Sequence, residues 1–319
     1  MRWVIIGAGA IGGLIGARLF EHGSDVALVA RGEHYRAIQT AGLQVDGPDG
    51  TTISRLPVVD HVAALTFGPD DVVVVATKSQ QTAEVLAALS VAAPPETPVI
   101  CAQNGVENER LALRRFANVY AMCVMCPASH LEPGVVRAHR GPVAGILDLG
   151  RYPAGLDDTA TGLATGLATA GFLSEPKPDI MRWKYKKLLL NLGNAIEAIC
   201  GPESRGGELY ERALGEGVAC LDAAGISYVT DADDRARRGD LIPRPPGGKP
   251  RGGSSWQSML RQTGNVEADY LNGEIVLLGR RHDVPTPVNA VLQRLANQLA
   301  STHTPPGSMT ADDILALTS

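Results

Sequence analysis

The sequence predicts an α/β N-terminal domain built on a parallel sheet, followed by an all-α C-terminal domain. Three observations predict this fold class. Apolar, strand-like runs alternate with helical stretches in the first half of the chain, a glycine-rich turn follows the first run, and long helical patterns fill the second half. With 319 residues the chain is long enough for two domains, which we place at residues 1–177 and 178–319.

The strands of the first domain are expected at four apolar runs: Arg2–Ile6, Asp25–Ala30, Asp71–Thr77 and Pro98–Ala102. Helical patterns fall between or after several of them, and that alternation indicates a parallel sheet covered by helices. The Ala-, Thr- and Gly-rich stretch Asp158–Ala170 predicts one more helix, and residues 171–178 predict a strand and a linker.

The second domain is expected to be helical. Long helical patterns occupy the following stretches: Arg182–Cys200, Gly207–Ala224, Asn265–Arg281 and Pro287–Ala300. Between them, residues 242–253 are rich in Pro and Gly and include basic residues, a composition that cannot pack a core. We expect a mobile surface loop there, with a lid over the adjoining site as the alternative.

The composition excludes several classes of function. A net charge of -5 argues against a nucleic-acid partner, because phosphate binding needs clustered Lys and Arg. No apolar run reaches the roughly eighteen residues that span a bilayer. No signal-peptide cleavage pattern follows the N-terminus. We therefore expect a cytoplasmic protein that binds neither nucleic acid nor membrane.

The five cysteines have no disulfide-framework spacing. Cys123 and Cys126 form a CxxC at the end of the strand-like run Val119–Met125. Residues three apart on a strand point to opposite faces, so we interpret both as buried structural thiols and expect no metal site. A metal or redox role is the alternative.

A glycine-rich turn follows the first strand and opens a helix, which is the context of a dinucleotide-binding fingerprint. Gly7 permits the tight turn, Gly9 lets the backbone approach a pyrophosphate, and Gly12 lets the helix lie close to the sheet. The N–H groups at the helix start can then bind phosphates. The turn predicts a Rossmann-like domain whose cofactor contacts are Gly7, Ala8, Gly9, Ala10, Ile11 and Gly12.

The end of the second strand favours NADP(H) over NAD(H). An NAD site usually has Asp or Glu there to bind the ribose hydroxyls. Here the strand ends at Arg31, whose guanidinium can pair with a 2′-phosphate. Glu33 comes two residues too late and is expected to be exposed. His34 is also expected to be exposed in a loop, with a contact to the adenine or phosphate as the alternative.

Two further strands are followed by polar residues. Lys78 follows Asp71–Thr77, and Asn104 follows Pro98–Ala102. Ligands of parallel sheets bind at the carboxyl ends of strands, so we expect both side chains to contact the cofactor. The alternatives are a plain surface lysine and a structural Asn-Gly turn.

A polar stripe marks the first helix of the second domain. Lys187, Asn191 and Asn194 lie at i, i+4 and i+7, so each asparagine lies within about 40° of Lys187 around the helix axis. A lysine and two amides among leucines are costly to bury without partners, so we expect them to line a polar pocket. An exposed stripe is the alternative. Lys184 and Lys186 lie off this stripe and are expected to be exposed.

A second group of candidates follows the Pro/Gly-rich segment. Ser254 and Gln257 form a capping-box pattern, which places Ser255 in a first helical turn, where it can bind a carboxylate. Glu267 would lie about 18 Å further along one straight helix. Gly264–Asn265 predicts a break there and a new helix from near residue 266, which brings Glu267 back toward Ser255. The alternative for Glu267 is an acid that complements a helix dipole.

Taken together, these residues resemble the ketopantoate reductases (2-dehydropantoate 2-reductases) over nearly the whole chain. The resemblance rests on Gly7–Gly12, Arg31, Thr77–Lys78, Gln103–Gly105, Trp183 with Lys187 and Asn191, Ser254–Ser255 and Glu267–Gly273. It implies that Lys187 is the general acid and that Asn191, Ser255 and Glu267 contact the substrate. It also implies that Lys78 and Asn104 lie near the cofactor and its nicotinamide.

The resemblance implies NADPH-dependent reduction of a small-molecule 2-oxo acid, with 2-dehydropantoate and pantothenate biosynthesis as the first expectation. Lys187 and Glu267 are then catalytic, and the substrate-binding residues are Asn104, Asn191, Asn194 and Ser255. The oligomeric state stays open, with a homodimer as one option.

Two alternatives remain. The family often has an asparagine where this chain has Ala195, and the segment after Ser255 also departs from the family pattern. Both differences favour a related reductase with another carbonyl or imine substrate. The alternative of a different class is a non-catalytic NADPH-binding sensor.

Overall fold

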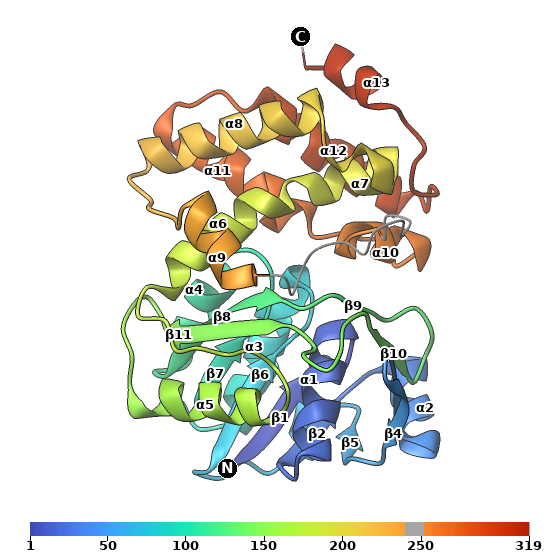
Figure 1. Cartoon of the computed structure of the whole chain (residues 1–319), viewed down its shortest axis with the longest axis vertical. Coiled ribbons are helices and arrows are strands. Elements are labelled where there is room, and N and C mark those ends of the chain that lie inside the picture. Colours follow the sequence, from blue (N-terminus) through green and yellow to red (C-terminus); the bar gives the residue numbers. More distant parts are fainter. Residues whose placement is uncertain (240–251, 319) are drawn as a thin grey trace. The chain divides into compact units, whose positions relative to one another are not determined.

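The computed structural model of the chain describes residues 1–239 and 252–318 (Figure 1). The chain divides into two compact units, Met1–Met181 and Arg182–Ser319. Most of the Pro/Gly-rich segment 242–253, and with it the question of a lid, lies outside the described residues.

A seven-stranded sheet with the order β11-β8-β7-β6-β1-β2-β5 forms the centre of unit 1. Its strands are β1 (Arg2–Ile6), β2 (Asp25–Val29), β5 (Val58–Val59), β6 (Asp71–Val75), β7 (Val99–Cys101), β8 (Val119–Met125) and β11 (Ile146–Arg151). All neighbours pair in parallel except β8 and β11. The expected parallel sheet is confirmed, with one antiparallel strand at its edge. The segment between β8 and β11 has no crossover helix to return the chain in parallel.

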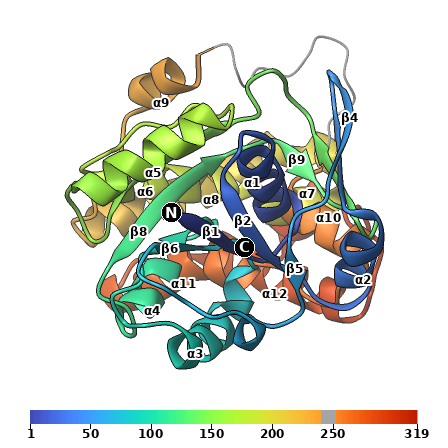
Figure 2. The ribbon, with the colours of Figure 1, turned by 90° about the horizontal axis from the view of Figure 1, so that it is seen from below.

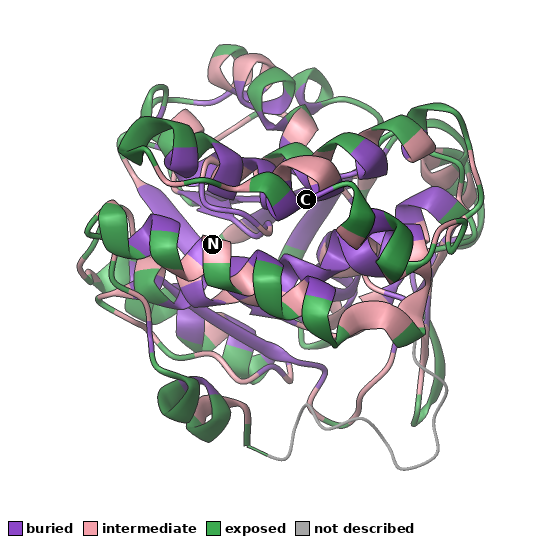
Figure 3. Cartoon of the chain, turned by 90° about the horizontal axis from the view of Figure 1, so that it is seen from above, coloured by how far each residue is buried: buried purple, intermediate pink, exposed green. Residues whose placement is uncertain are grey.

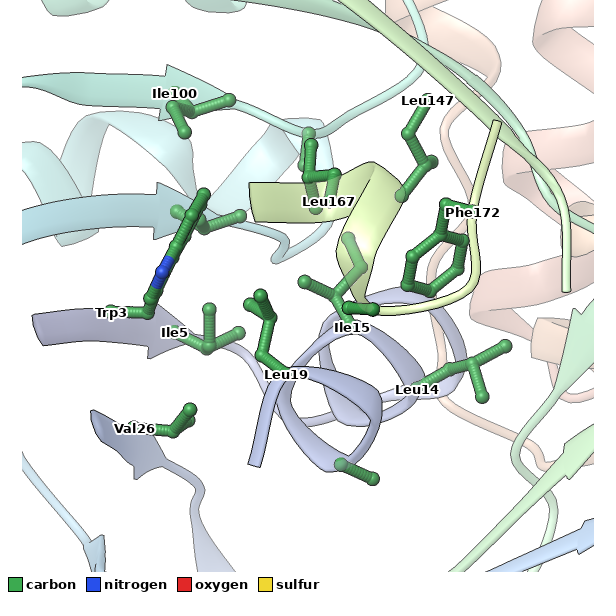
Figure 4. Packing of buried hydrophobic residues seen from close by; sticks show 14 of the residues in the cluster. Trp3, Ile5, Leu14, Ile15, Leu19, Val26, Ile100, Leu147, Leu167 and Phe172 are labelled. Atoms are coloured by element: carbon green, nitrogen blue, oxygen red, sulfur yellow. The ribbon is translucent and has the colours of Figure 1, made fainter. Parts of the chain in front are cut away.

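Helices cover both faces of this sheet. The helices α1 (Ala10–Glu21) and α5 (Asp158–Thr169) lie on one face, and α3 (Thr82–Ala92) and α4 (Asn108–Leu113) lie on the other (Figure 2). On the first face, Leu14, Ile15 and Leu19 of α1 pack with Leu167 of α5 and the strand residue Ile5 (Figure 4). Each such side chain contributes about 1.5–3 kcal/mol when it is fully buried. This packing fixes where α1 begins relative to β1.

A second, smaller sheet in unit 1 was not anticipated from the sequence. It has the order β4-β3-β10-β9, with β3 (Leu43–Gly47), β4 (Gly50–Ser54), β9 (Ala128–Ser129) and β10 (Val135–Ala138). Helix α2 (Gly32–Ala41) precedes it, and two 3-10 turns, Val62–Ala64 and Ser79–Gln81, complete the unit. The strands are short and β4 is largely exposed, so they leave no apolar run in the sequence.

The described part of unit 2 is helical. Its elements are α6 (Ile180–Asn191, which begins in unit 1), α7 (Gly193–Cys200), a 3-10 turn (Pro202–Arg205), α8 (Glu208–Ala223), α9 (Asp231–Arg238), α10 (Ser254–Leu260), a 3-10 turn (Ala268–Tyr270), α11 (Asn272–His282), α12 (Pro287–Ser301) and α13 (Ala311–Ala316). Buried and exposed residues alternate along these helices, as amphipathic helices require (Figure 3). The all-α class expected for this part is confirmed.

Two helices differ from the expectation. The helix expected over Arg182–Cys200 breaks at Leu192, whose N–H bonds to the carbonyl of Leu189 at 3.3 Å, three residues back. The helix expected from near residue 266 is a 3-10 turn, and α11 begins only at Asn272. Leu271, with φ -115° and ψ -87°, cannot continue a helix and separates the two.

All five cysteines are free thiols, and Cys126 donates to the carbonyl of Ala144 at 3.5 Å. Over the described ranges, no group of three or more His, Cys, Asp or Glu side chains is placed to bind a metal ion. Likewise, within residues 1–239 and 252–318, no helix has the length and apolar character needed to cross a membrane.

Candidate active site

The glycine-rich turn between β1 and α1 has the geometry of a dinucleotide-binding turn. Gly7 has φ +99°, and a Cβ there would lie 2.9 Å from the backbone nitrogen of Thr77. A Cβ on Gly12 would overlap the carbonyl oxygen of Gly7. Gly9 differs, because no atom lies within 4 Å of the position its Cβ would take. The two outer glycines are therefore needed for the turn itself, while the open space over Gly9 fits a pyrophosphate.

The start of α1 is suited to bind that pyrophosphate. Gly9 is the N-cap and provides no side-chain hydrogen bond, and the first turn contains no acidic residue. The first N–H groups of a helix have no intrahelical partners, and the helix dipole favours an anion there. The residues present thus fit the phosphates of a dinucleotide.

Arg31 lies two residues after the end of β2, as the N-cap of α2, and its side chain is 53% exposed. Its Nη1 lies 3.1 Å from Oε1 of Glu84, itself 68% exposed. An ion pair this exposed contributes about 0–1 kcal/mol, so a 2′-phosphate can replace Glu84 as the partner of Arg31.

A pocket in unit 1 joins the glycine turn to Arg31. It is lined by Ile6, Gly7, Ala8, Val29, Ala30, Arg31, His34, His61, Val62, Thr77, Gln81, Val85 and Ala88. Its walls come from the ends of β1 and β2 and from α3, which is where parallel sheets bind nucleotides. The structure thus brings Gly7, Ala8 and Arg31 together around one pocket. His61 also lines it, although no motif in the sequence points to this residue.

His34 corrects the expectation of an exposed loop residue. It is half-buried in α2, and its Nδ1 lies 2.8 Å from the backbone nitrogen of Gly134. Since an N–H can only donate, Nδ1 accepts, and the proton sits on Nε2, which donates to the carbonyl of Ala8 at 2.7 Å. The neutral ring thus holds the glycine turn in place. Its partner Gly134 is far away in sequence, so no local pattern could reveal this role.

The loops that follow β6 and β7 lie side by side. Ser79 Oγ donates to the carbonyl of Asn104 at 3.2 Å, and Asn108 Nδ2 donates to the same oxygen at 2.9 Å. Lys78 and Asn104 are both half-buried. Both loops lie at the carboxyl edge of the sheet, where ligands of parallel sheets bind. Neither the Lys78 nor the Asn104 side chain lines the pocket at Arg31.

A buried polar network stiffens these loops and was missed in the sequence. Gln103 Nε2 donates to the carbonyl of Thr77 at 2.9 Å and to Thr82 Oγ1 at 2.7 Å. The Thr82 hydroxyl donates in turn to Asn108 Oδ1 at 2.7 Å. Gln103, Thr82 and Asn108 are almost fully buried, so each hydrogen bond is costly to lose.

The polar stripe lies on α6 and α7. Lys187 and Asn191 are on α6, and Asn194 follows the break, on α7. Lys187 is half-buried, and the two asparagines are each 4% exposed. The exposed-stripe alternative is therefore wrong for the two amides. Asn194 Oδ1 already accepts a hydrogen bond from Arg205 Nη1 at 3.1 Å.

The two neighbouring lysines correct the expectation that they are exposed. Lys184 and Lys186 are both buried. Lys186 Nζ forms an ion pair with Asp231 at the start of α9, and its hydrogen bond and its charge lower the pKa of that carboxyl. The partner comes from a helix that the sequence pattern did not reveal, so burial of this lysine could not be foreseen.

The first turn of α10 contains Ser255, which is buried. The expected capping box is wrong, because the N-cap is Gly253 and not Ser254. In a capping box the third helical residue accepts from the N-cap N–H. Here the Gly253 N–H donates instead to a carboxylate oxygen of Glu197, on α7, at 2.7 Å. Glu267 is buried directly before the 3-10 turn Ala268–Tyr270.

Comparison with known protein families finds the same family over both units. Residues 3–154 match the model described as "Ketopantoate reductase PanE/ApbA", and residues 179–300 match its C-terminal counterpart. A 2-dehydropantoate 2-reductase of Halobacterium salinarum is 30% identical over 309 residues, which cover 92% of this chain and 97% of that relative. The corresponding enzyme of Pyrococcus horikoshii is 28% identical over 305 residues, or 92% and 96% of the two chains.

Solved structures are similar over the same extent. The crystal structure of a PanE/ApbA family ketopantoate reductase from Ralstonia eutropha has a TM-score of 0.80 and 27% identity, and the match covers 95% of this chain and 99% of that one. A D-mandelate dehydrogenase, solved with NADH and anilino(oxo)acetate, has a TM-score of 0.82 at 23% identity with the same coverage, and shares the fold.

Proposed function

The chain belongs to the ketopantoate reductase family, and from that premise we propose that it reduces a 2-oxo acid with NADPH, with 2-dehydropantoate as the substrate and pantoate as the product. One observation carries the proposal. A single chain combines a turn built for a dinucleotide with a lysine and a buried amide on one face of a leucine-rich helix. The first half binds a redox cofactor, and the second half supplies a proton donor.

We propose NADPH as the cofactor because of Arg31. It stands where an NAD site has an acid, and its ionic partner Glu84 is exposed and replaceable. The D-mandelate dehydrogenase of similar fold was solved with NADH, so NADH is the alternative. Arg31 favours the phosphorylated form.

The residues of this chain have separate tasks in the proposed reaction. When bound, the nicotinamide supplies a hydride to C2 of the substrate. Lys187 donates a proton to the C2 carbonyl oxygen, and its ammonium stabilises the charge that develops there. Ser255 and Asn191 bind the substrate carboxylate. Glu267 accepts a hydrogen bond from a substrate hydroxyl or positions Lys187. Substrate plus hydride plus proton gives the 2-hydroxy acid.

A different side chain on the 2-oxo acid is the second candidate. Ala195, buried on α7, offers no amide where the family often has one, and the amide oxygen of Asn194 is engaged by Arg205. These residues leave fewer polar groups for a hydroxylated substrate and favour a more apolar one.

A panel of 2-oxo acids, monitored by the loss of NADPH absorbance, tests the proposal. We expect 2-dehydropantoate to give the highest kcat/KM, with apolar branched 2-oxo acids next. If NADPH binds but no member of the panel accelerates its oxidation, the chain is a sensor and the proposal is wrong. If an apolar acid exceeds 2-dehydropantoate, the second candidate replaces the first.

A further inference from the structure

We infer that Glu197 and Arg205 are positioning residues that hold the first turn of α10, with Ser255, at a fixed place relative to the helix of Lys187. We call the two residues the Glu197–Arg205 pair. Both act through other groups and need not touch the substrate. The inference rests on the proposed function, since it takes Ser255 and Lys187 to bind one substrate.

Arg205 spans the break between α6 and α7. Its Nη2 donates to the carbonyl of Leu190 at 2.8 Å, on α6, one turn after Lys187. Its Nη1 donates to Asn194 Oδ1 at 3.1 Å and to Glu197 Oε1 at 2.8 Å, both on α7. A helix break leaves carbonyl groups without their intrahelical donors. Arg205 supplies such a donor and fixes the two helices at their junction.

Glu197 continues the connection to α10. Its side chain is 3% exposed, and its second oxygen accepts from the backbone nitrogen of Gly253 at 2.7 Å. Gly253 is the N-cap of α10 and comes two residues before Ser255. A Cβ at this glycine would overlap the same carboxylate oxygen and lie 3.2 Å from Asn194 Oδ1. The start of α10 therefore packs closely against two side chains of α7.

A buried carboxylate is a poor choice for stability alone. Burying an ion pair costs desolvation that its attraction rarely exceeds, and apolar residues of the same size often stabilise more. An ion pair is, however, directional. The carboxylate of Glu197 binds a guanidinium with one oxygen and a backbone N–H with the other, which fixes its orientation. The contacts converge on segments that contain proposed substrate ligands, and this points to positioning.

The variant Arg205→Ala tests the inference by steady-state kinetics. We expect KM for the 2-oxo acid to rise by at least about tenfold and kcat to fall, because displacements near 1 Å can cost about 10²-fold. KM for NADPH should stay within about twofold of wild type, since Arg205 belongs to the other unit. Arg212→Ala, which removes an exposed arginine of α8, is the matched control and should behave as wild type.

Chemical rescue distinguishes positioning from general loss of structure. The Arg205 side chain is 31% exposed, so a small cation can enter the space it leaves. Guanidinium ion at millimolar concentration should lower the raised KM of Arg205→Ala, and sodium ion should not. A variant with wild-type KM and kcat, or with KM for NADPH raised equally, overturns the inference.

Hydrogen exchange gives a readout that does not depend on turnover. In Arg205→Ala, amides of residues 253–260 should exchange faster than in wild type, while those of α12 should not change.

A second variant, Glu197→Gln, keeps an acceptor for the Gly253 N–H and serves as the test if Arg205→Ala fails to fold. It too should raise the substrate KM and speed exchange in α10. Unchanged exchange in α10 of the folded variant contradicts the pair's role. If wild type reduces no 2-oxo acid, the proposed function fails, while these exchange rates still test the pair.

Discussion

Arg31 is the residue on which the proposed preference for NADPH depends. Replacing it with alanine should remove most of the preference for NADPH, because one charge-assisted contact to a phosphate is worth about 1.5–3 kcal/mol, or at least about tenfold in affinity. Dissociation constants for NADPH and NADH, measured by fluorescence titration, check this. Arg36→Ala, an exposed arginine on the same helix, is the control. Equal affinities for both cofactors in the unmodified protein would contradict the proposed preference for NADPH.

Lys187 is the residue on which the proposed proton transfer depends. Lys187→Ala should lower kcat by at least about 10²-fold, the low end for losing general acid catalysis. Its affinity for NADPH should hardly change, because the proposed phosphate contacts lie in unit 1. Stopped-flow measurement of NADPH oxidation, with a separate binding titration, separates the two effects.

A control variant for Lys187→Ala should remove a lysine whose loss leaves unit 2 undisturbed. Lys186 is unsuitable, since its loss leaves Asp231 without its ionic partner. Lys177, which pairs with Glu175 in unit 1, is a better match, and Lys177→Ala should retain turnover. Near-normal kcat in Lys187→Ala would show that the proton comes from elsewhere, with Lys78 the next candidate.

At the level of elements, two glycines at the start of α1 are expected to serve different purposes, one in cofactor binding and the other in stability. Gly9 has φ -69° and open space around its Cβ position, so Gly9→Ala should fold normally and yet weaken NADPH binding by at least about tenfold. In Gly12→Ala the added methyl overlaps the Gly7 carbonyl, so this variant should lose stability, by about 1–3 kcal/mol or more. Thermal unfolding and cofactor titration of both variants check the pair of outcomes. Normal NADPH binding by Gly9→Ala would place the pyrophosphate elsewhere.

Elements with strong periodicity could be predicted, and those set by distant partners could not. The apolar runs of β1, β2, β6 and β7 and the fingerprint turn specify a parallel sheet locally. The break at Leu192 could not be foreseen, because it depends on donors from Arg205 and Asn272, far along the chain. The N-cap of α10 could not be predicted for the same reason, because its N–H bonds to Glu197 and not to a local side chain.

For the molecule as a whole, the proposed tasks divide between the units. Every proposed cofactor residue lies in Met1–Met181, and the proposed substrate residues, apart from Asn104, lie in Arg182–Ser319. This division could be predicted from the sequence, because the residues of the glycine-rich fingerprint and of the polar stripe can each be recognised from local patterns. It could not show how His34 or Arg205 supports them, because those roles depend on three-dimensional contacts.

Hydride transfer to C2 is the central claim, and deuterium labelling tests it most directly. The protein is incubated with 2-dehydropantoate and NADPH that bears deuterium at C4, each stereoisomer in turn, and the product is analysed by NMR. We predict that one isomer transfers its deuterium to C2, with one NADPH consumed for each pantoate formed. Product without deuterium at C2 from either isomer, or NADPH consumed without formation of a 2-hydroxy acid, would contradict the account.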